Sequence, residues 1–195
     1  IPRLKKIDIP ILETTNPNVD LLPLLKNHRG NTAFSINNKY ILDDELLSTG
    51  VNFFNIHGGL VQKYRGIAEI CVLAALCKGE NKYGVTLHKI LQGQEVDSGP
   101  VVAQIEFDIS SEDTFPVVLK KTLCACQKIF ERNIENVISG NYKTINADLF
   151  GTAYAYNDVP KICSEADAEA FAKASNLGPY TGFFPKLKAL IDSSR

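Results

Sequence analysis

The sequence contains no methionine and no tryptophan, and only three of its 195 residues are histidine. Because a translated chain normally begins with methionine and this one begins with Ile1, we expect that its first part is missing. No run of about 18 apolar residues occurs, which excludes an ordinary membrane-spanning helix. The first six residues do not have the pattern of a signal peptide. We therefore expect a cytoplasmic protein without a membrane partner.

Cysteine is present but not in a pattern that carries chemistry. The five cysteines are odd in number and lack the CxxC spacing of a zinc site. They lie mostly in helix-like segments, which favours small buried thiols in a reducing compartment over disulfides. The three histidines are too dispersed to indicate a metal. We expect no metal site.

The sequence also has no large excess of positive or negative charge. The formal net charge is −1 and the pI is about 6.4, with Lys and Arg scattered along the chain. This supplies no basic field for a nucleic acid partner. With 45% apolar residues, the chain can bury one good core. We expect one main domain, followed after residue 145 by a Tyr-rich extension.

The apolar pattern predicts alternating strands and helices, typical of an α/β fold with an open sheet. Strands are predicted at residues 32–36, 51–54, 83–91 and 101–109, with a β-like run at 7–12. Helices are predicted at residues 42–47, 67–78, 113–138 and 164–175, and a short helix or turn at residues 18–25. The aromatic tail at residues 180–185 is typical of an appended subdomain or a partner-facing extension.

Polar side chains follow the predicted strand at residues 51–54. Asn55 and His57 come at its end, and two glycines after them let a ligand approach the backbone. His57 is a candidate general base, because imidazole titrates near neutrality. Asn55 is either a turn residue or an amide donor to a developing oxyanion. Asp97 is either a turn residue or, if its loop folds back, the carboxylate that holds His57 in its proton-accepting tautomer.

Three further residues carry weaker signals. Lys63 and Arg65 are interpreted as solvated surface charges, with an anionic substrate group as the alternative partner. His88 lies in an alternating strand and is interpreted as structural.

From about residue 34 to residue 140, the motifs resemble the catalytic domain of formyl-tetrahydrofolate-dependent formyltransferases. The resemblance rests on Asn55-x-His57, Lys-Tyr-Arg-Gly at 63–66, Gly-Val-Thr-Leu-His at 84–88, Asp-Ser-Gly at 97–99 and Ser-Glu-Asp-Thr at 111–114. The family includes methionyl-tRNA formyltransferase and the enzymes that N-formylate nucleotide-linked amino sugars. The resemblance implies a Rossmann-like open twisted sheet, a catalytic domain at residues 1–145 and a C-terminal extension at 146–195.

The resemblance also implies an activity, transfer of a formyl group from formyl-tetrahydrofolate to a primary amine, and roles for single residues. Asn55, His57 and Asp97 would be catalytic. Residues that would face the folate are Tyr40, Ile41, Leu42, Val96 and Asp97, and residues that would face the amine acceptor are Lys63, Tyr64 and Arg65. A nucleotide-linked amino sugar is the first expectation for the acceptor, because the extension lacks the basic character of a tRNA-binding domain. A homodimer through the C-terminal part is one arrangement that would fit.

Three departures from the family pattern keep alternatives open. Residues 59–62 lack the serine and proline that usually follow the histidine, and the interval from His88 to Asp97 is longer than in the family. The first βαβ unit has no counterpart, so we expect that it was omitted or that another segment or chain covers that edge. The alternatives are a folate-dependent formyl hydrolase, formylation of an aminoacyl-tRNA, a carrier-bound amino acid or a purine precursor, and a non-catalytic binding module.

Overall fold

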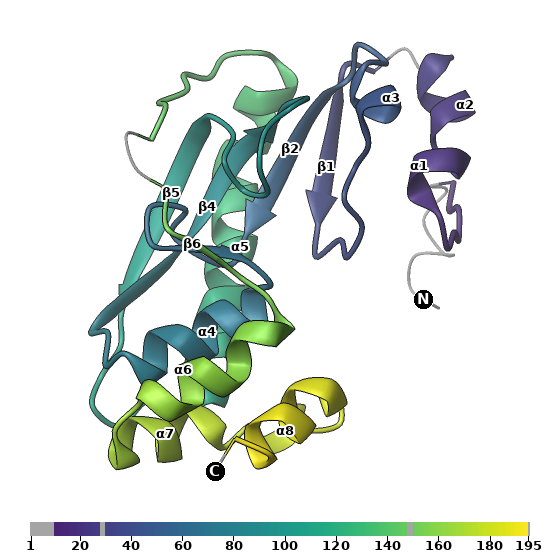
Figure 1. The fold of residues 1–195 in the computed structure, drawn as a ribbon. Helices are drawn as coiled ribbons and strands as arrows, with labels where there is room; N and C mark the ends of the chain where they lie inside the picture. The colour runs from purple at the N-terminus through teal and green to yellow at the C-terminus, as the bar shows by residue number, and fades with distance from the viewer. Residues whose placement is uncertain (1–9, 28–29, 148–149, 195) are drawn as a thin grey trace.

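The computed structural model describes residues 10–27, 30–147 and 150–194. Its main sheet has four strands in the order β1-β2-β4-β5 (Figure 1). Strand β1 (Thr32–Ile36) pairs in parallel with β2 (Asn52–His57), and β2 pairs antiparallel with β4 (Lys82–Ile90). Strand β5 (Val101–Asp108) is antiparallel to β4. The α/β class predicted from the sequence is confirmed.

Helix α5 (Phe115–Ile138) packs against β2, β4 and β5. Phe54 and Ile56 of β2 belong to an apolar cluster that includes Ala125, Ile129 and Val137 of this helix. Successive side chains of a strand point to opposite faces, so Asn55 and His57 point away from α5. The packing of the helix thereby decides which face of the sheet carries the polar residues.

Helix α4 (Ala68–Cys77) is apolar on all sides, and eight of its ten residues are buried. Three later helices contribute to the same cluster: α6 (Val159–Glu165), α7 (Ala168–Ser175) and α8 (Pro185–Asp192). Figure 1 shows them gathered around α4 below the sheet. Short 3-10 turns precede α6 at Tyr156–Asp158 and α8 at Gly178–Tyr180. The chain after residue 145 therefore shares a core with α4.

Three short helices lie beside the β1 and β2 end of the sheet. They are α1 (Pro17–Asp20), α2 (Leu22–Lys26) and α3 (Asp44–Leu47). Leucines from this region pack against a small cluster formed by Leu46 and Phe53 with Val51. In the described part of the chain, no helix has the length and apolar character needed to cross a bilayer.

A second sheet of two strands crosses the polar face. Strand β3 (Tyr64–Gly66) pairs in parallel with β6 (Thr152–Tyr154). The two strands are three residues long and far apart in the sequence, so no local pattern predicts them. Gly66 has a φ of +92°, and a Cβ atom there would lie 2.4 Å from the carbonyl oxygen of Tyr154. The pairing therefore requires glycine at this position.

The structure corrects several sequence predictions. Strand β2 continues through His57, because Ile56 packs into the core, so Asn55 and His57 lie within the strand and do not follow it. The helix predicted at 164–175 is two helices, because Ala166 is extended and the Asp167 side chain caps α7. The short helix or turn predicted at 18–25 is a pair of short helices, α1 and α2. Residues 7–9 of the predicted β-like run lie outside the described residues, and residues 10–12 form no strand.

Substitution of Gly66 tests the β3–β6 junction. Gly66→Ala should lower the free energy of unfolding by about 3 kcal/mol or more, because the left-handed φ and the clash with Tyr154 both oppose a Cβ. Gly79→Ala is the matched control, since Gly79 has a φ of +67° and open space around its Cβ position. It should cost about 1 kcal/mol. Urea denaturation measures both, and equal costs would contradict the proposed clash.

Candidate active site

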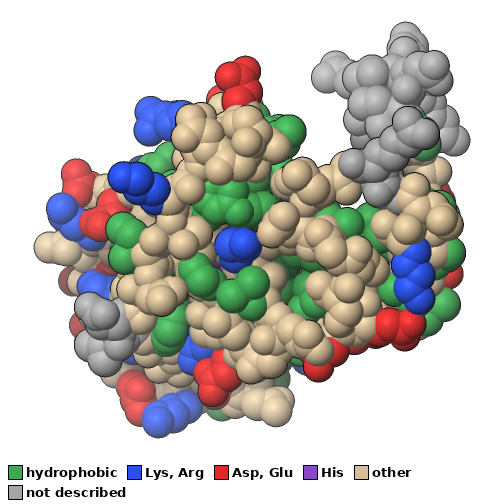
Figure 2. All heavy atoms as spheres, turned by 90° about the horizontal axis from the view of Figure 1, so that it is seen from above, with side chains coloured by type: hydrophobic (Ala, Val, Ile, Leu, Met, Phe, Trp, Pro, Cys, Tyr) green, Lys and Arg blue, Asp and Glu red, His purple; other side chains and the backbone are tan. Residues whose placement is uncertain are grey.

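Neighbouring strands bring two polar residues opposite each other. Asn55 of β2 pairs directly with His88 of β4, and His57 pairs with Thr86. The Nδ2 atom of Asn55 lies 3.3 Å from Nε2 of His88. Both imidazoles are buried, with His57 4% and His88 2% exposed. Neither ring is visible on the face shown in Figure 2.

Asp97 lies at the centre of this group. It belongs to the Asp97 loop (residues 91–100), which follows β4 and folds back over the strands. One carboxylate oxygen, Oδ1, accepts a hydrogen bond from Nδ2 of Asn55 at 2.8 Å and lies 3.3 Å from Nε2 of His88. The other, Oδ2, accepts from the amide of Gly66 at 2.9 Å and lies 3.3 Å from Nδ1 of His57. The sequence-predicted trio of Asn55, His57 and Asp97 is therefore brought together, and His88 joins it.

The backbone fixes the tautomer of both histidines. Nε2 of His57 lies 2.9 Å from the carbonyl oxygen of Tyr64, and Nδ1 of His88 lies 2.8 Å from that of Lys89. A carbonyl only accepts, so each of these nitrogens carries a proton. The proton-accepting nitrogens are then Nδ1 of His57 and Nε2 of His88, and both face Asp97. The sequence assigned the choice of tautomer to Asp97, whereas in the structure a carbonyl of β3 makes it.

Burial and charge set the protonation of the group. Burial lowers the pKa of His57, and this outweighs the opposing attraction of Asp97 and the Tyr64 carbonyl. Burial alone would raise the pKa of Asp97. A hydrogen bond from His88 in its protonated form, the charge of protonated His57 and the Gly66 amide nevertheless lower the pKa of Asp97 to about 2. Near neutral pH the site therefore holds an ionised Asp97 beside a neutral His57 that can take up a proton.

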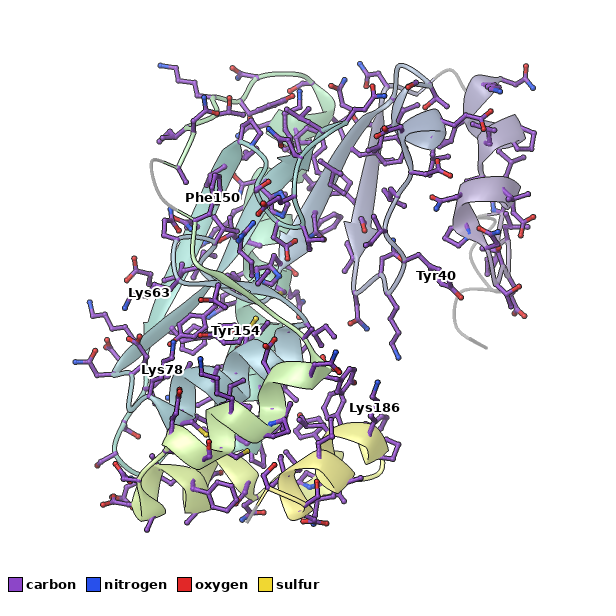
Figure 3. All side chains as sticks on the ribbon, in the orientation of Figure 1. Tyr40, Lys63, Lys78, Phe150, Tyr154 and Lys186 are labelled. Atoms are coloured by element: carbon purple, nitrogen blue, oxygen red, sulfur yellow. The ribbon has the colours of Figure 1, made fainter. Side chains whose placement is uncertain are left out.

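Two other predicted residues lie on strand β3, inside the protein. Tyr64 is 2% exposed, and its hydroxyl donates to Glu80 at 3.0 Å. Arg65 is 8% exposed, so its interpretation as a solvated surface charge is corrected. Lys63 remains exposed and pairs with Glu80 at 2.9 Å, and Figure 3 shows it on the same side as Phe150.

The residues predicted to face the folate lie on exposed loops. Tyr40 and Ile41 are 48% and 75% exposed, and Leu42 packs against the cluster around Leu46. Figure 3 shows Tyr40 on the side of the N-terminal helices, away from Lys63. The carbonyls of Tyr40 and Ile41 accept hydrogen bonds from Asn38 and Asn18 within the chain. Val96 is 46% exposed and directly precedes Asp97.

The sequence predicted three members of the site and missed two contributors. His88 was interpreted as structural, although its pairing opposite Asn55 follows once the β2–β4 register is known. The carbonyl of Tyr64 carries no signal in the sequence, because any residue supplies one. Among the described residues, no group of three or more His, Cys, Asp and Glu side chains is arranged to hold a metal ion.

Comparison with known proteins shows the family to which the chain is similar. A family model described as formyl transferase matches residues 37–134, which is 98 of 195 residues. A methionyl-tRNA formyltransferase of Kosmotoga olearia is 36% identical over 112 residues, covering 57% of this chain and 33% of the relative. The chain therefore spans about a third of the length of that curated relative.

Solved structures give the same result. An N-formyltransferase from Helicobacter canadensis, in complex with folinic acid and dTDP-3-aminofucose, is 25% identical with a TM-score of 0.58, covering 64% of this chain and 45% of that chain. The sugar 3N-formyl transferase WlaRD, solved in the presence of dTDP and 5-N-formyl-THF, is 28% identical with a TM-score of 0.58, covering 64% and 44%.

The low pKa of Asp97 makes stability depend on pH. Its pKa of about 2 in the folded state lies below the ordinary value of 3.8, so the folded state is stabilised while the carboxylate is ionised. This contribution, about 2 kcal/mol, is complete above the ordinary value and is lost as the pH falls from about 4 through 2. In Asp97→Asn this contribution to the free energy of unfolding is absent, so it cannot be lost as the pH falls. Urea denaturation between pH 6 and pH 2.5 measures it.

Asp108→Asn is the control, because Asp108 is exposed at the end of β5, outside the site. This variant should lose as much free energy of unfolding at acidic pH as the parent does. Equal loss of stability in the parent and in Asp97→Asn would show that the folded state does not hold Asp97 ionised.

Proposed function

We propose, because this chain belongs to the formyl transferase family, that it transfers a formyl group from formyl-tetrahydrofolate to a primary amine. The observation that carries the proposal is the contact of Asn55 and His57 with one buried carboxylate, Asp97. Formyl transfer needs an oxyanion donor and a base held near each other in a site shielded from water. The group of Asn55, His57 and Asp97 supplies both.

The chemistry can be assigned to atoms. Attack of the amine nitrogen on the formyl carbon places a negative charge on the formyl oxygen and a positive charge on the nitrogen. Asn55 holds Asp97 with one N–H of its Nδ2 group. The second N–H can stabilise the oxyanion, because it is shared at most with His88 at 3.3 Å.

The proton follows a second route. The amine nitrogen releases a proton, and Nδ1 of His57 is the atom of this ring that can accept one. The imidazolium so formed lies 3.3 Å from Oδ2 of Asp97, which stabilises its charge. Collapse of the tetrahedral intermediate breaks the carbon–nitrogen bond to the folate, and the proton passes to that folate nitrogen. One proton therefore moves from acceptor to donor, with no net gain or loss.

The folate would bind between the Asp97 loop and the loop after β1. Tyr40 and Ile41 expose apolar surface on one of these loops, and Val96 does so on the other. Exposed apolar side chains are typical of a surface that binds an apolar planar ligand. Two similar solved enzymes contain a reduced folate, folinic acid in one and 5-N-formyl-THF in the other.

For the acceptor we favour a nucleotide-linked amino sugar. The two structural relatives at 25% and 28% identity are sugar N-formyltransferases. The formal net charge of −1 also supplies little electrostatic attraction for RNA. Lys63, which is exposed and paired with Glu80, would meet an anionic group of the acceptor. The 36% identity to a methionyl-tRNA formyltransferase favours an aminoacyl-tRNA as the second candidate.

Single substitutions in the group test the activity. The protein is incubated with formyl-tetrahydrofolate and a dTDP-linked amino sugar, and release of tetrahydrofolate is followed. His57→Ala should lower turnover about 100-fold or more. Asn55→Ala should cost on the order of 3 kcal/mol of transition-state stabilisation, and Asn55→Asp more, because it adds a charge of the wrong sign.

Asn52→Ala is the matched control, since Asn52 is an asparagine at the other end of β2. It should keep the turnover of the parent. Turnover of His57→Ala within about threefold of the parent would contradict the proposed base. Release of tetrahydrofolate only in the presence of methionyl-tRNA would favour the second acceptor. Release in the absence of any amine would indicate a hydrolase.

The pH dependence of the rate tests Asp97. The attraction of Asp97 raises the pKa of His57, although burial lowers it more. Asp97→Asn removes this attraction, so the pKa of His57 should fall further. Because the base must be neutral to accept a proton, the acidic limb of the pH–rate profile should move to lower pH while the maximal rate falls. A profile with an unchanged acidic limb would remove Asp97 from the proton route.

A further inference from the structure

The backbone at Asp97 needs support from outside its loop. Asp97 has a φ of +53°, a left-handed conformation that is uncommon for residues other than glycine. The six residues before it, 91–96, are all exposed, so apolar burial does little to hold this part of the loop. The carboxylate nevertheless lies within 3.3 Å of both imidazoles. Something else must set the path of the loop.

Arg65 reaches the loop directly before Asp97. Its Nη1 atom donates to the carbonyl oxygen of Val96 at 3.1 Å and to the carboxylate of Glu95 at 3.0 Å. Glu95 is a weak partner, because its side chain is 81% exposed. The bond to the Val96 carbonyl is therefore the one that can fix the backbone.

The guanidinium is itself held in place. Its Nε donates to the carbonyl oxygen of Gly151 at 2.8 Å, and the ring of Phe150 lies 5.6 Å from its centre. The amide of Gly151 in turn donates to the carbonyl oxygen of Val61 at 2.9 Å. Arg65 thus joins two separate segments, the one before β6 and the Asp97 loop, through the fixed fork of its guanidinium.

We propose that Arg65 is a positioning residue, which holds the Asp97 loop so that the carboxylate reaches His57 and His88. That Arg65 matters for formyl transfer rests on the function proposed above. That Arg65 holds the Asp97 loop in place does not depend on that function. A lysine carries the same charge but lacks the fork, so it cannot bond Gly151 and Val96 together. Charge and position can therefore be separated by substitution.

The titration of His57 reports the position of Asp97. The groups that face this imidazole are Asp97, His88, Arg65 and the Tyr64 carbonyl. The attraction of Asp97 raises the pKa of His57, and the repulsion of Arg65 lowers it. Loss of the Arg65 charge alone would therefore raise the pKa of His57. Withdrawal of Asp97 would lower it, so the two effects have opposite signs.

The experiment follows the imidazole ring protons by NMR across pH in the parent, Arg65→Lys, Arg65→Gln and Asp97→Asn. In Arg65→Lys the charge is kept but the loop is released, so the pKa of His57 should fall. The decrease should be about half or more of the decrease measured in Asp97→Asn. In Arg65→Gln the pKa of His57 should also fall, despite the lost repulsion. Glu95→Gln is the control and should titrate like the parent.

An unchanged or raised pKa of His57 in Arg65→Lys would overturn the proposal, as would an equal fall in Glu95→Gln. If Arg65→Lys fails to fold, Arg65→Gln decides alone, because only withdrawal of Asp97 lowers the pKa there. In the formyl transfer assay, Arg65→Lys should lose about 10- to 100-fold in kcat with a smaller change in KM. If the parent transfers no formyl group, the proposed function fails, and the titration still decides the role of Arg65.

Discussion

The site depends on keeping one carboxylate ionised inside the protein. Removing a carboxylate from water costs several kcal/mol, and this cost is offset only when its oxygens are hydrogen-bonded or paired with charge. Asp97 meets this condition with the amide of Gly66 on β3 and the side chain of Asn55 on β2, and with the imidazoles of His57 and His88 when these carry an added proton. Because these partners lie on three different strands, β2, β3 and β4, their contacts with one carboxylate fix the strands relative to one another. Any change in the sheet register or in β3 would leave an oxygen of Asp97 without a partner.

Strand β3 supplies the second half of this constraint. Its three residues each make a different contact with the site: the Tyr64 carbonyl accepts from His57, the Arg65 side chain donates to Val96, and the Gly66 amide donates to Asp97. A strand this short is not stable alone, and it is held by β6 and by the burial of Tyr64 against α4. The C-terminal helices that pack on α4 therefore support the geometry of the site, although none of the contacts to Asp97 comes from them.

The sequence predicted what local patterns determine. Strand β1 has the predicted bounds, and α4 and α5 were predicted to within two residues at either end, because apolar periodicity and a following glycine mark them. Polar residues at the ends of apolar runs made Asn55, His57 and Asp97 candidates, and the resemblance to formyltransferases implied that they act as a group. Strand β3, the burial of Arg65 and the contact of His88 with Asp97 were missed. Each depends on a partner distant in the sequence, such as Gly151 for Arg65, and period-two alternation does not show which residue lies across the ladder.

The geometry shows which of the two histidines gains more from taking up a proton beside Asp97. Each ring has one nitrogen bound to a backbone carbonyl, so in the neutral form both present a lone pair to Asp97. Two lone pairs facing an ionised carboxylate repel it, whereas one added proton turns a repulsive contact into a charge-assisted hydrogen bond. At His88 the second N–H of Asn55 can relieve the repulsion by donating to Nε2 until an oxyanion accepts it, but His57 has no such donor beside Nδ1 among the described contacts. Proton uptake at His57 therefore gains the most from Asp97, although burial opposes it. An imidazole in this balance can accept a proton during a reaction and release it afterwards, as transfer between an amine and a folate nitrogen requires.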